Sequence, residues 1–111
     1  MKIKLEKLLA YTASCTLKWI QPNEEFQKQF DEEIEVIDLY VENCIPLLED
    51  DKQREVKIYK EDAVIISKAL QWIIDDESLL KKLEEESEGT YYYWPGMIRN
   101  TINDINVAVR F

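Results

Sequence analysis

The sequence predicts an all-α fold, a small four- or five-helix bundle in which residues 1–111 form a single acidic helical domain. Three observations predict it. The chain has only two glycines and three prolines, too few for the many tight turns of a β-sandwich or barrel. Apolar residues make up 46% of the chain, which is enough to build a core at this length. The longest periodic segment repeats its apolar residues every three or four positions, the spacing of one helix face.

Residues 1–20 carry two competing patterns. One is a helical face formed by Leu5, Leu8, Leu9, Thr12, Thr16 and Ile20. The other is a strand-like alternation between Tyr11 and Trp19, a stretch rich in residues that favour strands. Because no turn residue interrupts the segment, we expect one long helix. The two chain ends also alternate and could pair as a minor two-stranded β element. The residues concerned are Met1, Ile3, Leu5, Val107, Val109 and Phe111.

The strongest helix signal follows a break at Gln21-Pro22. Asn23 is a suitable N-cap, because its side chain can accept a hydrogen bond from the first turn of a helix. An apolar stripe then steps by three or four residues through Phe26, Phe30, Ile34, Ile37, Val41, Cys44 and Leu48. Proline cannot continue a helix, so Pro46 should end this one near Asn43 or Cys44.

A short element and a long helix are expected after the polar residues 49–54. Residues 56–59 indicate either a short extended piece or the lead-in to a helix. Asp62 could cap the helix that follows. Residues 63–73 are apolar around much of the helix circumference, so we expect this helix to be the central one.

Two further helices complete the predicted bundle. The polar residues 75–78 mark a break, after which residues 79–88 form a short helix that Gly89 should end. The last helical face lies between Met97 and Val109. We find no internal repeat and no linker that would divide the chain.

The amino-acid composition excludes several kinds of chemistry. Histidine is absent, which rules out Ser-His-Asp and Cys-His catalysis and HExxH zinc sites within this chain. Cys15 and Cys44 are far apart in the sequence and form no C-x-x-C motif, so we expect buried free thiols and a reducing, cytoplasmic location. No apolar stretch is long enough to span a membrane. We expect neither a cofactor nor a metal.

Charge is concentrated in one part of the chain. The formal net charge is −9, and residues 23–51 hold eleven acidic residues against one lysine. Such a surface repels nucleic acid and anionic membranes, whereas it suits a protein partner with a basic surface. The candidate binding residues on the helix face are Asp31, Glu32, Glu35, Asp38 and Glu42. These carboxylates could instead mimic nucleic-acid phosphates, or form only a solvated helix face.

A second candidate surface is the run of four aromatic residues Tyr91, Tyr92, Tyr93 and Trp94. Neighbouring side chains diverge in a helix or a strand, so four consecutive aromatics cannot all face one core. Tyrosine and tryptophan are enriched at binding hot spots. We therefore expect some of these rings to be exposed for partner binding, although they could also close the end of the bundle.

One acidic motif suggests an enzyme. Glu35 and Asp38 have the E-x-x-D spacing, and the run from Glu32 to Val41 resembles the magnesium-binding helix of all-helical nucleotide pyrophosphohydrolases. That resemblance implies Mg²⁺ held by carboxylates from two helices. The second pair departs from the pattern, because Lys28 stands three residues after Glu25. Glu85 with Glu88, and Asp62, are the remaining candidates.

These observations favour a non-enzymatic protein that acts by binding another protein. Small acidic helical proteins without histidine are typical of inhibitors and antidotes, such as phage inhibitors of host defence, immunity proteins and antitoxins. One alternative is a structural protein that self-associates, for example as a homodimer, through the stripe between Phe26 and Leu48. The other is the magnesium-dependent enzyme.

Overall fold

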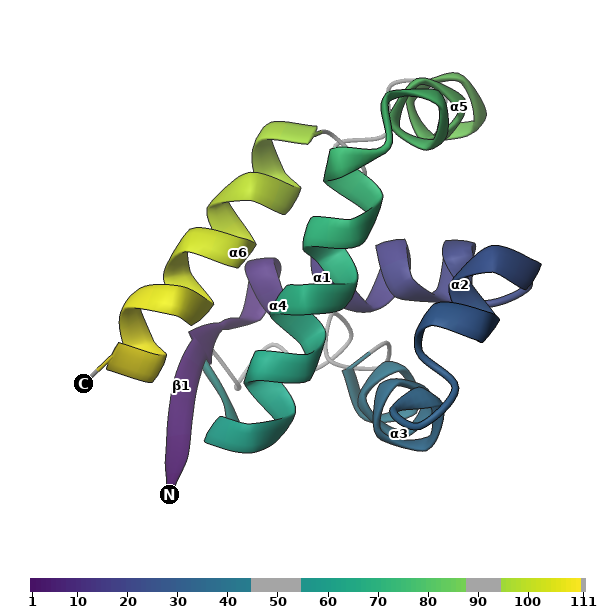
Figure 1. The fold of residues 1–111 in the computed structure, drawn as a ribbon. Coiled ribbons are helices and arrows are strands. Elements are labelled where there is room, and N and C mark those ends of the chain that lie inside the picture. The colour runs from purple at the N-terminus through teal and green to yellow at the C-terminus, as the bar shows by residue number, and fades with distance from the viewer. Residues whose placement is uncertain (45–54, 88–94, 111) are drawn as a thin grey trace.

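The computed structural model of the chain describes residues 1–44, 55–87 and 95–110. Within these ranges it contains six helices and one two-stranded antiparallel sheet (Figure 1), which confirms the mostly helical class. In chain order the elements are β1 (Lys2–Glu6), α1 (Lys7–Ile20), α2 (Glu24–Gln29), α3 (Ile34–Cys44), β2 (Glu55–Tyr59), α4 (Lys60–Asp75), α5 (Glu77–Ser87) and α6 (Pro95–Arg110).

The first twenty residues form a strand that runs directly into a helix, so the prediction of one long helix is wrong for the first six. Ile3 and Leu5 are buried in β1, and the residues on either side of them are exposed. Glu6 keeps extended ψ at 139°, and the chain becomes helical at Lys7 without any glycine or proline. A change at a single ψ angle is enough, which is why the sequence offers no turn signal here.

The small sheet joins the N-terminus to the middle of the chain. β1 pairs with β2, and Ile3 lies opposite Ile58 while Leu5 lies opposite Val56. The predicted pairing of the two chain ends is wrong, because α6 continues to Arg110. The last element buries Ile98, Thr101, Ile102 and Ile105, a set spaced for one helix face and not for a strand.

The predicted long helix after Asn23 is in fact two helices. Asn23 is confirmed as the N-cap of α2, since its Oδ1 accepts from the Phe26 N–H at 3.0 Å. A turn between α2 and α3 then changes the direction of the chain. It allows Phe26 and Phe30 to pack on Trp72 of α4, while α3 packs on α1. One straight helix could not make both sets of contacts.

The apolar stripe is nevertheless used as one buried surface. Ile34 is half-buried, Leu48 lies outside the described residues, and the other members are buried. The stripe that could have supported self-association therefore packs in the chain's own core. α3 ends at Cys44, as the proline at position 46 predicts.

The predicted break at residues 75–78 is shorter in the structure, because α4 ends at Asp75 and α5 begins at Glu77. Asp76 caps α5, because its Oδ1 accepts from the N–H groups of Ser78 and Leu79 at 3.0 and 3.1 Å. Asp62 is not the cap of α4, whose N-cap is Tyr59, and lies instead in the first turn. A carboxylate there still favours the positive end of the helix dipole. Gly89 lies outside the described residues.

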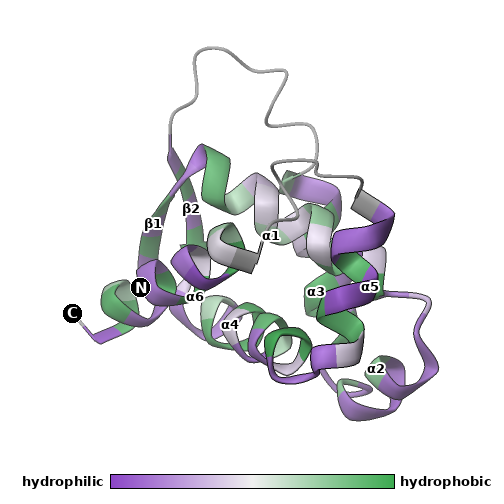
Figure 2. Ribbon diagram, turned by 90° about the horizontal axis from the view of Figure 1, so that it is seen from above, coloured by the Kyte–Doolittle hydropathy of each residue, from purple (hydrophilic) through white to green (hydrophobic). Residues whose placement is uncertain are grey.

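α4, which the apolar content of residues 63–73 predicts to be central, contacts α1, α3, α5, α6 and both strands, and α1 is the more deeply buried of the two helices. Nine of the fourteen residues of α1 are buried, against six of the sixteen in α4. α1 contacts α3, α4 and α6, and Figure 1 shows α4 crossing it. In Figure 2, hydrophobic and hydrophilic residues alternate along the helices, as expected where each helix has one buried face.

One buried hydroxyl group of α1 has no hydrogen-bond partner, and this predicts a stabilising substitution. The Thr12 hydroxyl is buried and unpaired, whereas the Thr16 hydroxyl donates to the Thr12 carbonyl at 2.9 Å. Thr12→Val should therefore raise the free energy of unfolding by about 1 kcal/mol, because valine fills the same space without an unpaired polar group. Thr16→Val is the matched control on the same helix and should give no gain. Urea unfolding measures both, and equal effects would contradict the assignment.

Candidate docking surface

The predicted acidic residues lie on the turn between α2 and α3 and on one flank of α3. Asp31 and Glu32 belong to the turn, and Glu35, Asp38 and Glu42 follow along α3. Residues three and four apart share a helix face, so the last three form one row. We call these five residues the acidic face.

Four of the five carboxylates are exposed and have no partner among the residues that the structure describes. Asp31, Glu32, Glu35 and Glu42 are exposed. In the part of the chain that the structure describes, none of them forms a hydrogen bond or an ion pair. No lysine or arginine among the described residues is therefore bonded to them to offset their negative charge.

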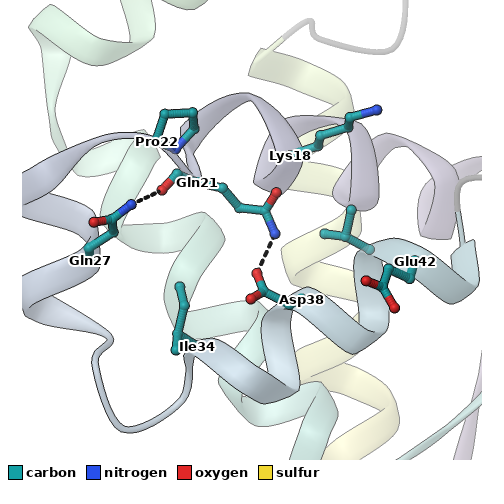
Figure 3. A pocket seen from close by; sticks show the side chains of 8 residues that line it. Lys18, Gln21, Pro22, Gln27, Ile34, Asp38 and Glu42 are labelled. Atoms are coloured by element: carbon teal, nitrogen blue, oxygen red, sulfur yellow. Dashed lines mark hydrogen bonds between the residues drawn. The ribbon is translucent and has the colours of Figure 1, made fainter.

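Asp38, the fifth residue, has a structural role. Its Oδ1 accepts a hydrogen bond from the Gln21 side chain at the end of α1, and the Gln21 carbonyl accepts one from the Gln27 side chain of α2 at 2.8 Å (Figure 3). Gln21 thus connects three helices. Tyr40 adds a buried contact, because its hydroxyl donates to the Ala10 carbonyl at 2.9 Å. These bonds fix α3, and with it the acidic face, against α1.

A hollow of about 570 Å³ lies beside Asp38 and Glu42 (Figure 3). Its remaining lining residues are Lys18, Gln21, Pro22, Gln27, Ile34 and Val41. The hollow has a mixed lining, with an apolar wall from Ile34 and Val41 and carboxylates on the rim. Lys18 is the cation among its lining residues, and it forms no ion pair with any described residue. The hollow could receive a long side chain of a bound partner, with a basic end group near the rim.

The other flank of α3 forms an apolar surface that sequence reasoning missed. Val36, Leu39 and Asn43 line one wall of a groove of about 640 Å³, and the residues of β2 line the opposite wall. We call it the β2–α3 groove. Leu39 is 59% exposed, unusually open for a leucine within a helix that also contributes to the core. The sequence contains one indication of this surface, because residues 36 and 39 are apolar but do not belong to the buried stripe.

The remaining candidates from the sequence are not brought into one site. Tyr91, Tyr92, Tyr93 and Trp94 lie outside the described residues. Across residues 1–44, 55–87 and 95–110, the structure has no group of three or more acidic or cysteine side chains placed to hold a metal ion. Glu35 and Asp38 therefore meet no second carboxylate pair within those ranges.

Both cysteines are free and buried. Burial raises the pKa of the Cys44 thiol from its ordinary 9.0 to about 11, although a hydrogen bond with Tyr40 opposes part of the shift. Tyr40 has its pKa raised well above 10.0, first by burial and then by the neighbouring Cys44. A thiol that stays protonated at neutral pH is a poor nucleophile, so Cys44 serves packing.

None of the helices in the described ranges is both long enough and apolar enough to cross a membrane. No family model, curated protein or solved structure matches this chain.

Proposed function

We propose that this protein is a non-enzymatic inhibitor or antidote that binds a basic surface of another protein through its acidic face. The observation that carries the proposal is the set of four exposed carboxylates on α3 and the turn before it, which have no partner among the described residues, while α3 is hydrogen-bonded to the end of α1. Complementary charge would speed the encounter and fix the orientation of the partner. The protein would act in the cytoplasm, where its two free cysteines stay reduced.

Three charge reversals on the acidic face should remove partner binding without unfolding the protein. The test variant combines Glu32→Lys, Glu35→Lys and Glu42→Lys, all at exposed positions. Like charges across an interface oppose association, so we expect the dissociation constant to rise about 100-fold or more. The partner is first isolated by affinity capture from a nuclease-treated lysate, and binding of the purified partner is then measured by calorimetry at low and high salt.

The matched control has the same change in net charge at exposed sites away from this face. It combines Glu77→Lys, Glu85→Lys and Asp104→Lys. Glu77 also matches Glu35 in lying in the first turn of a helix. If both triple variants lose affinity equally, only the net charge matters. If the acidic-face variant binds as well as the wild type, the acidic face is not the docking surface.

A further inference from the structure

The outer edge of β2 presents backbone groups that are not used within the described residues. Lys60 N–H donates to the Met1 carbonyl at 3.0 Å, so these two residues form a hydrogen-bonded pair of the antiparallel ladder. Such pairs alternate along the ladder, which makes Ile58 the next residue of β2 that bonds to β1. The N–H and C=O groups of Lys57 and the N–H group of Tyr59 therefore point away from β1, whereas the Tyr59 carbonyl, at the N-cap of α4, accepts from the first turn of that helix. None of the turn, loop and cap hydrogen bonds between described residues involves the backbone of Lys57 or the N–H of Tyr59.

This edge of β2 forms one wall of the β2–α3 groove. Figure 2 shows β2 on the side of the sheet that faces α3. A groove of about 640 Å³ is within the usual size range of a binding pocket, roughly 300–1,000 Å³. Leu39 and Tyr59 are 59% and 53% exposed, so two large side chains at this groove remain open to an incoming chain. The arrangement is suited to the addition of one extended strand.

The charges on the sheet favour an acidic residue at one position of that strand. Lys57 lies directly opposite Lys4 across the sheet, and Lys2 lies beside Tyr59, with its Nζ 4.7 Å from the ring centroid. Like charges directly opposite each other destabilise a strand pair. A carboxylate placed next to Lys57 would offset this repulsion. Glu55 at the start of β2 and Asp62 after its end are themselves acidic. The preference for an acidic residue is therefore restricted to the position beside the centre of β2.

The residues on each side of that acidic position should be apolar. Side chains alternate between the two faces of a strand, so the neighbours of the acidic residue would point to the opposite face. On that face Val56 is buried and Ile58 is half-buried. Val36 and Leu39 of α3 supply further apolar surface at the groove. β-branched apolar residues fit such a half-buried sheet position.

We propose that the β2–α3 groove binds an extended peptide segment of a partner protein. The segment adds to the edge of β2 as an antiparallel third strand. It places an acidic residue opposite Lys57, and a β-branched apolar residue stands on each side of that acidic residue. This site is separate from the acidic face and has the opposite charge preference. It does not depend on the proposed function, since it uses the other flank of α3.

The experiment titrates the full chain with a synthetic probe, acetyl-Ser-Thr-Val-Glu-Val-Thr-Ser-amide, and follows backbone amide shifts by NMR. Binding should shift the amides of Lys57, Tyr59 and Leu39 and leave those of Glu35 and Glu42 unchanged. A probe with lysine in place of glutamate should bind about tenfold more weakly, the effect of losing one favourable charge contact. The Lys57→Glu variant should reverse this preference, and it removes the repulsion from Lys4, so it should fold.

Methylation of single peptide nitrogens tests whether the probe binds as a strand. A methyl group on the glutamate nitrogen removes the donor to the Lys57 carbonyl and should weaken binding about tenfold or more. The same methyl on either valine nitrogen, which points away from β2, is the matched control and should be tolerated. Equal binding of these probes, or no shift at millimolar probe, would overturn the proposal. A dimer that the probe does not dissociate would assign the edge to a second copy of the chain and would also overturn it.

Discussion

Replacing Phe26 with alanine should lower the free energy of unfolding by about 3–5 kcal/mol. Phe26 is fully buried, and its ring centroid lies 4.8 Å from that of Phe30 and 5.6 Å from that of Trp72. It is the only buried residue of α2, a helix of six residues that is too short to be stable alone. Because small domains have about 5–15 kcal/mol of stability in total, the variant should lie close to the unfolding threshold.

Urea unfolding followed by circular dichroism measures this loss. Val107→Ala is the control, because Val107 is 52% exposed on α6 and its truncation should change stability by no more than about 0.5 kcal/mol. A Phe26→Ala variant that loses less than about 1 kcal/mol would show that α2 is not held by this aromatic cluster. The partner binding that we propose for the acidic face should weaken as well, since α2 leads directly into the turn with Asp31 and Glu32.

The sequence predicts the helices well where apolar periodicity and capping residues coincide. Asn23 shows this, because it lies directly before a regular apolar stripe and is confirmed as the N-cap of α2. The break between α2 and α3 was not predictable in the same way, because residues 30–33 contain no glycine or proline. The turn exists because Phe26 and Phe30 pack on Trp72 while α3 packs on α1. The position of the turn is decided by contacts between segments that are distant in the sequence, and a local sequence pattern carries no information about such contacts.

The sheet illustrates the same limit. The alternation of Ile3 and Leu5 indicates a strand, but alternation alone cannot identify the partner strand. Residues 56–58 and 107–109 carry equally short patterns, and only the packing of the helices selects the first. The position of the acidic face on one flank of α3 follows from helical spacing. The β2–α3 groove could not be predicted in this way, since its walls come from two elements, and no local sequence pattern indicates that these elements face each other.

Alkaline pH should destabilise the protein through Cys44 and Tyr40. The Cys44 thiol ionises near pH 9 in the unfolded chain and at about 11 in the folded protein, chiefly because it is buried. Burial likewise raises the pKa of Tyr40 well above 10.0 in the folded state. The unfolded state therefore loses these protons first, and stability that is complete below pH 9 falls as the pH rises toward 11. For Cys44 alone, two pH units correspond to about 3 kcal/mol.

The variants Cys44→Ala and Tyr40→Phe separate this ionisation from packing. Each removes one titrating group, so the decline of the unfolding free energy between pH 9 and 11 should become shallower, even though each variant is less stable at pH 7. Val41→Ala is the control, because it truncates a buried residue of the same helix and removes no proton. It should lower stability equally at every pH. Urea unfolding under reducing conditions from pH 7 to 11 measures all four proteins. If Cys44→Ala and Val41→Ala decline in parallel, the alkaline loss comes from other groups, since only the thiol distinguishes the two variants.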